Sequence, residues 1–338
     1  MPRRHLPLRL IALSLVAGLS VGACNLTGGT PAPAGTPLLV GLGYIPSVQF
    51  APFYLADQEG YYRNGGLDVT FQNKIETDLI PLVGQGSIDI GVADGTDVIP
   101  AVSQQIPVRY IATIYGTYPS IVFAKASSGI KTAADLRGKK IGIPGRYGSS
   151  WIMLQALLGS AGLTTSDVRI QEYPDFGQGV AVQQGAVDAA TGFVNNEPVQ
   201  LKLNGIQTVL LQVDQIVALP GPGLIAGAST LDTKKAAIAA FVAATMRAMN
   251  EITADPSKGL DAAIAAVPTL ASSRATQEAI LAATIPTWSG PLTMTRGFGA
   301  IDDAGWTASI AFMTKLGLVP NPVTLTDLVR KDLLPAGG

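Results

Sequence analysis

Short apolar segments alternate along the chain with longer stretches in which apolar residues recur at helical spacing. Residues 67–71 (LDVTF) alternate between apolar and polar side chains, as a half-buried strand does. A helical stretch follows, and Val83-Gly-Gln-Gly-Ser-Ile-Asp-Ile-Gly91 then brings a glycine turn and a second strand. Residues 38–42 and 50–58 predict a further strand and helix ahead of this pair. The order of strand, helix and strand is the βαβ unit of a parallel sheet.

The same order of elements returns about 100 residues further along the chain. Residues 168–172 predict a strand, and Val182-Gln-Gln-Gly-Ala-Val-Asp-Ala-Ala190 follows with a glycine turn and another strand. Ahead of them lie a strand over residues 140–143 and a helix over residues 149–158. A capped short helix at Thr132–Asp135 introduces this half. The near-repeat predicts two similar α/β lobes.

The pattern changes after about residue 215, where helical spacing dominates. Helices are expected over residues 233–253, 260–267, 276–284, 301–316 and 326–334. No strand of comparable quality is expected in this part of the chain. We expect these helices to pack back on the lobes that precede them.

These patterns predict the fold class α/β, with two lobes joined by a hinge. Lobe 1 comprises residues 38–124 and 216–338, including the C-terminal helices, and lobe 2 comprises residues 125–215. Hinge segments are expected near Ala124–Gly129 and Gln212–Gly223.

The N-terminus indicates an export signal. Three arginines precede an apolar run over residues 10–21, which is too short for a permanent membrane span. Val21-Gly-Ala-Cys24 resembles the cleavage box of bacterial lipoproteins, which implies that residues 1–23 are removed and Cys24 is lipidated. The alternative is an ordinary secretory signal with an incidental cysteine. Residues 24–37 are rich in Gly, Pro and Thr and predict a flexible tether, so we expect a lipid-anchored protein on the outer side of the cell membrane.

Charge and reactive side chains narrow the possible functions. The 338 residues include 23 Lys and Arg against 24 Asp and Glu, and this balance without basic clusters argues against a nucleic-acid partner. The single histidine, His5, and the single cysteine, Cys24, both lie in the N-terminal segment. A processed chain would lack imidazole and free thiol, which excludes Ser-His-Asp and Cys-His nucleophiles and His-ligated metals. Enzymes that use only carboxylates or lysines are not excluded by this composition. The prediction is nevertheless a protein without enzymatic activity, metal or cofactor.

Several segments resemble one family of binding proteins. The run from Val48 to Val69 (VQFAPFYLADQEGYYRNGGLDV) is similar to the opening of the ABC-transporter substrate-binding proteins related to thiamine-precursor synthases and alkanesulfonate binders. The segments GSID at 86–89, LRGKKIG at 136–142 and GAVD at 185–188, with the stretch from Trp306 to Pro335, extend the resemblance over residues 38–335. The resemblance implies a periplasmic-binding-protein-like fold whose lobes close on a ligand and deliver it to a membrane permease. The family includes binders of pyrimidines, sulfonates, nitrate and riboflavin, so the ligand stays open.

Ligand contacts are expected in the turns at the carboxyl ends of the strands, where open α/β sheets bind ligands. Of the 21 Phe, Trp and Tyr residues, 12 fall in or just after such turns. Each alone is readily explained by core packing, but as a set they favour a flat ring held between aromatic faces. The candidate ligand-binding residues are Tyr44, Gln49, Phe50, Asp94, Thr96, Tyr115, Tyr118, Arg146, Tyr147, Ser149, Trp151, Asn195 and Glu197. The same turns carry Phe53, Asp97, Ser150, Phe176, Phe193 and Asn196.

Arg146 is the only fixed positive charge among the polar turn residues. An anion binder would be expected to offer more cations, although helix N-termini alone can hold an anion. The turn at 144–151 leads into a helix, and its N–H groups and hydroxyls are candidates for a polar ligand group, with a plain N-cap by a serine as the alternative. Glu197 resembles an acid that the thiamine-precursor binders carry in a similar place. Next to Pro198 it is also a candidate helix cap or dipole partner.

A neutral aromatic ligand rich in N–H and O–H donors suits these residues best. The leading hypothesis is a lipid-anchored protein that captures riboflavin for an ABC permease, and it rests on the size of the aromatic set and on resemblance to riboflavin-binding members. The first alternative is a binding protein for a pyrimidine thiamine precursor, and an alkanesulfonate or nitrate binder ranks below it. A pyrimidine-synthesising enzyme ranks last, because the related synthases use His and Cys residues that the processed chain would lack.

Overall fold

The computed structural model describes residues 35–213 and 216–335. The predicted export signal, Cys24 and most of the predicted tether lie outside the described residues. Among the helices within these ranges, none has the length and apolar character needed to cross a membrane. The signal and the lipid anchor therefore stay predictions.

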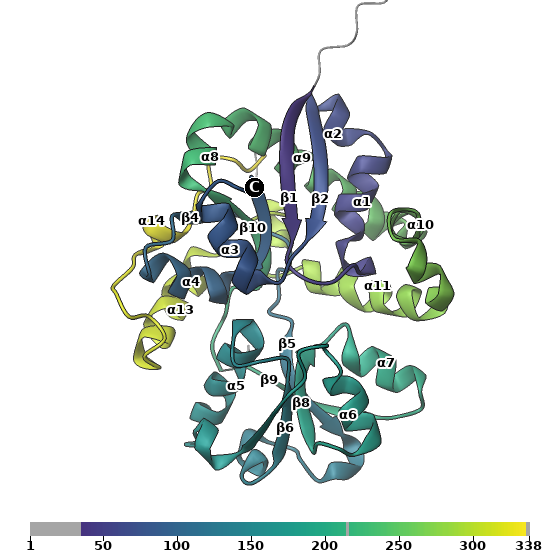
Figure 1. The fold of residues 1–338 in the computed structure, drawn as a ribbon, viewed down its shortest axis with the longest axis vertical. Coiled ribbons are helices and arrows are strands. Elements are labelled where there is room, and N and C mark those ends of the chain that lie inside the picture. Colours follow the sequence, from purple (N-terminus) through teal and green to yellow (C-terminus); the bar gives the residue numbers. More distant parts are fainter. Residues whose placement is uncertain (1–34, 214–215, 336–338) are drawn as a thin grey trace, which may run out of the picture. The chain divides into compact units, whose positions relative to one another are not determined.

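A five-stranded sheet with the order β2-β1-β3-β10-β4 forms the centre of the first lobe (Figure 1). Its strands are β1 (Thr36–Leu42), β2 (Leu67–Asn73), β3 (Ile90–Asp94), β4 (Val108–Thr113) and β10 (Pro222–Gly227). β1 pairs in parallel with β2 and β3, which confirms the predicted βαβ unit. β10 runs antiparallel between β3 and β4.

The second lobe repeats this arrangement in the order β7-β6-β8-β5-β9. Its strands are β5 (Ser120–Lys125), β6 (Lys140–Ile143), β7 (Arg169–Glu172), β8 (Ala189–Phe193) and β9 (Thr208–Gln212). β6 pairs in parallel with β7 and β8, and β5 runs antiparallel between β8 and β9. The two sheets therefore match strand for strand, as the near-repeat predicts.

The chain crosses from the first sheet to the second between β4 and β5 and returns between β9 and β10. β5 lies wholly in the second sheet, so by sheet membership lobe 2 begins near residue 120, ahead of the expected boundary at 125. The expected first hinge, Ala124–Gly129, comes after this crossing. The expected second hinge, Gln212–Gly223, spans the return but runs into β10. Local periodicity does not reveal β5 or β10 as the first strand after a crossing, because both are short segments without clear alternation and their pairing partners lie far away in the sequence.

Helices cover both sheets. The first lobe carries α1 (Ala51–Gln58), α2 (Tyr61–Asn64), α3 (Glu76–Gly84) and α4 (Gly95–Ser103), and the second carries α5 (Gly148–Ser160), α6 (Gln178–Gln184) and α7 (Glu197–Leu203). After β10 come α8 (Ala228–Thr233), α9 (Lys235–Ala254), α10 (Pro256–Ala266), α11 (Arg274–Trp288), α12 (Thr293–Arg296), α13 (Asp303–Lys315) and α14 (Leu325–Leu328). Four of the five expected C-terminal helices are confirmed as α9, α10, α11 and α13. The fifth is shorter than expected, because Val329 leaves the helix and bridges to Tyr110 of β4.

The capped short helix expected at Thr132–Asp135 is confirmed as a 3-10 helix over Ala133–Leu136. The backbone N–H of Thr132 donates to Asp135 Oδ2 at 2.8 Å, and the Thr132 hydroxyl donates to the same atom at 2.9 Å. This capping box fixes where the chain enters β6.

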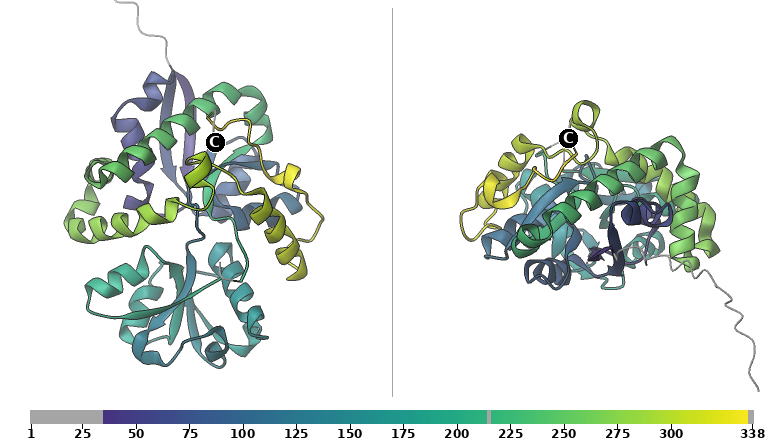
Figure 2. Two further views of the ribbon diagram at one scale, coloured as in Figure 1. Left: turned by 180° about the vertical axis from the view of Figure 1, so that it is seen from behind. Right: turned by 90° about the horizontal axis from the view of Figure 1, so that it is seen from above.

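The C-terminal helices pack on the first lobe, and the rear view in Figure 2 shows the long α9 helix crossing its sheet. Tyr62 of α2 and Phe241 of α9 stack with ring centroids 4.7 Å apart and planes within 5° of each other. Phe53 of α1 stacks on the same Phe241 ring at 6.2 Å. These buried rings join α1, α2 and α9 into one core with β1 and β2.

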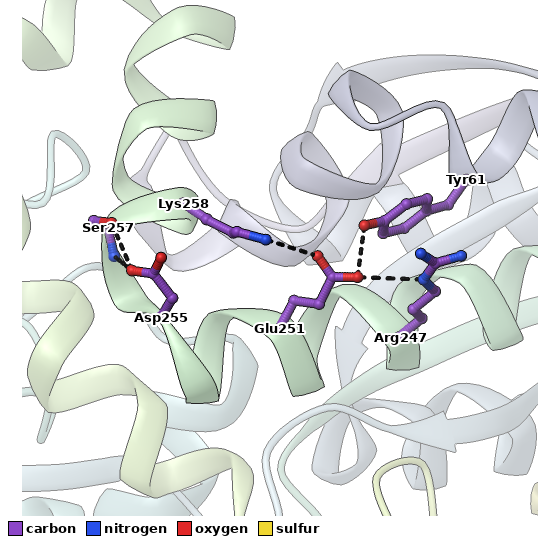
Figure 3. Close-up of polar contacts among 6 residues, drawn as sticks. All are labelled: Tyr61, Arg247, Glu251, Asp255, Ser257 and Lys258. Atoms are coloured by element: carbon purple, nitrogen blue, oxygen red, sulfur yellow. Dashed lines mark hydrogen bonds and ion pairs between the residues drawn. The ribbon is translucent and has the colours of Figure 1, made fainter.

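A polar cluster at the surface joins α2, α9 and α10 (Figure 3). The Glu251 carboxylate accepts hydrogen bonds from Tyr61 Oη at 2.6 Å, Arg247 Nε at 3.3 Å and Lys258 Nζ at 3.4 Å. The Arg247 guanidinium also lies 3.8 Å from the centre of the Tyr61 ring. Because the Arg247 and Lys258 side chains are about half exposed, each ion pair contributes roughly 1 kcal/mol or less.

Candidate functional site

A hollow of about 1000 Å³, counted with its open mouth, lies at the carboxyl ends of the strands of both lobes. The first lobe contributes residues that follow β1, β2, β3 and β4, and the second contributes residues that follow β6, β7 and β8. Seven of the thirteen candidate residues line the cavity: Tyr44, Gln49, Phe50, Tyr115, Tyr147, Ser149 and Glu197. The principle that ligands bind beyond the carboxyl ends of the strands therefore leads to this cavity.

Aromatic rings from both lobes form its apolar wall. Tyr44 of the first lobe meets Phe176 of the second edge-on, with ring centroids 4.9 Å apart and planes at 83°. Phe176 has a left-handed backbone with a φ of 59°, which is uncommon for a bulky residue and costs on the order of 1 kcal/mol or more. Tyr147 is 37% exposed and lines the cavity with the buried rings of Phe50 and Tyr115. The wall can therefore pack against a flat ring from several directions.

Glu197 is the buried acid of the second lobe. It begins α7, is followed by Pro198, and accepts hydrogen bonds from the backbone N–H of Phe193 at 2.9 Å and from Gln178 Nε2 at 3.2 Å. Burial raises the pKa of Glu197 to about 7, and the hydrogen bond from Phe193 offsets part of the rise. A Cβ on Gly192 would come within 2.5 Å of Glu197 Oε2, so glycine at this position makes room for the carboxyl group. Glu197 thus begins a helix and lines the cavity as well.

Gln178 is a polar residue of the cavity wall that the sequence analysis missed. It begins α6 and is only 1% exposed. Its amide nitrogen binds Glu197, whereas its Oε1 has no hydrogen-bond partner among the described residues. This oxygen is therefore a buried acceptor without a partner beside the cavity.

Three acids of the first lobe form a second polar group, the acid cluster, made of Glu76, Asp94 and Asp97. Carboxylate oxygens of the three lie within 4.8 Å of one another, and Glu76 Oε2 accepts from the backbone N–H of Asp94 at 2.9 Å. Glu76 and Asp97 line the cavity, and Asp94 is completely buried behind them. Burial raises the pKa of all three carboxyl groups, and repulsion from neighbouring carboxylates raises the pKa of Glu76 and Asp94 further. Because the pKa of Asp94 rises to about 8 and that of Asp97 to about 6, the cluster keeps a proton on Asp94 near neutral pH while Asp97 is largely ionised.

The acid cluster also bears on metal binding. Three carboxyl groups at this spacing are a possible ligand set for a hard cation such as Ca²⁺. The expectation of a metal-free protein therefore stays a prediction. Within the described ranges no Lys, Arg or His side chain lines the cavity, so its polar wall consists of acids, amides and hydroxyls.

Asn195 joins the two lobes and does not line the cavity. Its side chain is completely buried, and its Nδ2 donates to Gln49 Oε1 at 3.0 Å and to Thr284 Oγ1 at 2.7 Å. Tyr115 Oη also donates to Gln49 Oε1, at 3.4 Å. Asn195 thus ties β8 of the second lobe to α11 and to the start of α1 in the first. Its effect on a ligand would run through Gln49 and Tyr115.

The other candidates outside the cavity wall are Asp94, Thr96, Tyr118, Arg146 and Trp151. Thr96 is completely buried, and Tyr118 Oη donates to the backbone carbonyl of Ser149 at 3.2 Å. Arg146 pairs with the exposed Glu172 at 3.0 Å, and its guanidinium lies 5.4 Å from the centre of the Trp151 ring. The only candidate cation is therefore occupied at the outer surface of the second lobe.

The model of the family described as NMT1/THI5 like matches residues 47–259. Riboflavin-binding protein RibY from Chloroflexus aurantiacus is 30% identical over 347 residues, which cover 98% of this chain and 99% of that protein. The chain belongs to the NMT1/THI5-like family. A formylaminopyrimidine-binding protein from Halalkalibacterium halodurans is 24% identical over 334 residues, covering 94% of this chain and 97% of its own. Pyrimidine phosphate synthases match about half of the chain.

The solved structures confirm the fold of this NMT1/THI5-like protein. The alkanesulfonate-binding protein SsuA from Xanthomonas axonopodis pv. citri, bound to MOPS, has a TM-score of 0.69 at 19% identity and covers 89% of this chain and 100% of that chain. The predicted two-lobed periplasmic-binding-protein fold is therefore confirmed. Two relatives that match along nearly the whole chain are named as binding proteins, which supports a solute-binding protein.

Proposed function

We propose that this protein is the substrate-binding component of an ABC importer and that its ligand is riboflavin. The observation that carries the proposal is the cavity between the lobes, where aromatic rings from both lobes accompany acids and amides and no cation of the described chain takes part. The full-length similarity to a riboflavin-binding protein supports the same ligand. The ligand would be bound reversibly and released unaltered.

The isoalloxazine ring would lie against the aromatic wall, where each stacked ring contributes about 1 kcal/mol beyond area burial. Tyr44 and Phe176 reach it from opposite lobes, and Tyr147 covers it at the mouth. Because the pKa of Glu197 is about 7, its carboxyl group can donate or accept a hydrogen bond near neutral pH. That versatility suits a ring edge on which N–H and C=O groups alternate. The acid cluster would accept hydrogen bonds from ribityl hydroxyls.

Ligand binding would favour the closed arrangement of the lobes. Contacts such as Tyr44 with Phe176 and Asn195 with Gln49 exist only while the lobes are together. A ligand that touches both lobes adds contacts to the closed state alone. It therefore binds the closed state more tightly and shifts the equilibrium from the open to the closed state. The closed lobes would then present the ligand to the permease.

A pyrimidine thiamine precursor is the second candidate ligand. The formylaminopyrimidine-binding relative supports it, and the Glu197 and Gln178 side chains offer adjacent groups for an amino-substituted ring. A sulfonate or nitrate ranks lower, because the described cavity wall holds no cation. A pyrimidine-synthesising enzyme ranks last, since a chain processed at Cys24 has neither histidine nor a free thiol.

The proposal includes attachment to the outer side of the cell membrane through lipid on Cys24, with residues 24–37 as a tether. Such an anchor keeps the binding protein near its permease, which raises the effective concentration of one for the other.

Fluorescence titration tests the ligand. Riboflavin fluorescence should be quenched on binding, because the ring stacks on aromatic faces. Tyr44→Ala should weaken binding about tenfold. Tyr61→Ala is a matched control, because Tyr61 lies on the first lobe but contacts Glu251 away from the cavity. If calorimetry gave a clear binding isotherm with an aminopyrimidine and none with riboflavin, the riboflavin assignment would be wrong and the pyrimidine thiamine precursor would become the proposed ligand.

A further inference from the structure

The N-terminus of α5 opens on the cavity from the second lobe. The helix is 13 residues long, and its first residues, Gly148, Ser149 and Ser150, line the cavity. The first N–H groups of a helix have no partner within the helix, and together with the helix dipole they attract anions. A negatively charged ligand group would therefore be drawn to this point.

Asp97 of the first lobe already occupies that point. Its carboxyl group lines the cavity together with the first residues of α5, and its Oδ2 has no hydrogen-bond partner among the described residues. A Cβ on Gly148 would lie 3.9 Å from Asp97 Oδ2, which places the carboxylate beside the first turn of α5. Asp97 also contacts the carboxyl group of Glu76, and both line the cavity. The partial positive charge of the helix end is thus matched by an acid of the protein itself.

A separate observation concerns the polar side chains of the cavity wall. Gln178 is 1% exposed, lines the same cavity and has an Oε1 without a partner in the described part of the chain. Beside it lies Glu197, a third acid in the wall. Arg146, which precedes α5, is held by Glu172 at 3.0 Å. The charged side chains of the described cavity wall are therefore all acids.

We propose that Asp97 acts as a built-in anion at the N-terminus of α5 and so makes the site select the unphosphorylated vitamin over its phosphate ester. The inference rests on the proposed function and extends it to the charge of the ligand. A phosphate group carries between one and two negative charges at pH 7 and would meet a helix end whose partial positive charge the Asp97 carboxylate already offsets. Like charges brought together in this way lower affinity by on the order of 100-fold or more.

Fluorescence titrations of the full chain with riboflavin and with riboflavin 5′-phosphate, at equal ionic strength, test the inference. The wild type should prefer riboflavin by about 100-fold or more. Asp97→Ala should lower that preference at least about tenfold, mainly because the phosphate ester gains affinity at the freed N–H groups. Glu76→Gln should lower it less, because one acid is neutralised while the helix end stays occupied. Asp78→Asn is the matched control, since Asp78 is an exposed acid of the same α3 helix.

A second measurement does not depend on the vitamin. Inorganic phosphate, compared with chloride at equal ionic strength, should raise the unfolding temperature of Asp97→Ala and leave that of the wild type unchanged. If neither riboflavin nor an aminopyrimidine bound, the proposed function would fall, and the phosphate measurement would still decide the role of Asp97. Equal wild-type affinity for the two flavins would overturn the inference, as would an Asp97→Ala protein with unchanged preference and no stabilisation by phosphate.

Discussion

Glu197 is a buried carboxyl group whose titration should be visible in the stability of the ligand-free protein. Burial raises its pKa from the ordinary value of 4.5 to about 7, so the folded protein holds its proton more tightly than the unfolded chain does. The resulting stability is fully present below pH 4.5 and is lost as the pH rises through 7. The perturbation is therefore a change of pH from 5 to 8, applied to the wild type and to Glu197→Gln.

The magnitude follows from the size of the shift. One pKa unit corresponds to about 1.4 kcal/mol, so the rise from 4.5 to about 7 corresponds to about 3 kcal/mol of unfolding free energy. For a chain of this length that is a change of about 6 °C in unfolding temperature. Glutamine keeps the shape of Glu197 and can still accept from the backbone N–H of Phe193, while the Gln178 amide can rotate to accept from the new NH₂ group. The substitution thus removes the titration and retains the hydrogen bonds.

Differential scanning calorimetry across this pH range is the assay, and the difference between variant and wild type is the quantity to follow. Other carboxyl groups of the cavity also titrate, but they are common to both proteins and cancel in the difference. The unfolding temperature of Glu197→Gln minus that of the wild type should be about 6 °C larger at pH 8 than at pH 5. Glu278→Gln, at an exposed position of α11, should show no such gain. If the unfolding temperatures of wild type and Glu197→Gln changed in parallel with pH, the argument that burial raises the pKa of Glu197 would be refuted.

Three further predictions concern the whole protein. Cys24→Ser should release it into the soluble extracellular fraction with unchanged ligand affinity, and continued membrane association would contradict the lipoprotein hypothesis. Small-angle scattering should show a smaller radius of gyration at saturating ligand, whereas an unchanged profile would favour a rigid site. Mass spectrometry of ligand recovered after long incubation should show an unmodified molecule, and a modified product would count against a binding protein.

The fold could be predicted largely from the sequence, because its elements repeat. The alternating stretch 67–71 and the apolar strand 140–143 each stand next to a clear helix and a glycine turn, and both are confirmed as β2 and β6. The sequence analysis did not predict β10. The run PGLIAG at 222–227 contains two glycines and a proline, and it forms a strand only by pairing with β3 and β4. That pairing joins residues more than 100 positions apart and leaves no periodic signal in the segment itself.

The site could be predicted in part, because turn residues were considered without the direction of their side chains. Ser149 faces the cavity, but Trp151, two positions further along α5, is turned by about 200° around the helix axis and packs beside Arg146. Glu76 was missed although it follows β2, a strand end that the same reasoning covers. Gln178 gave no signal, because it comes several residues after the end of β7 and reaches the cavity through tertiary packing alone.

The absorption spectrum of the protein purified from a riboflavin-containing medium tests the central claim most directly. The account predicts a yellow protein with a flavin spectrum, whose released ligand has the mass of riboflavin and not of its phosphate ester. A colourless protein that retained no riboflavin after incubation and desalting, and that released a different molecule on unfolding, would contradict it.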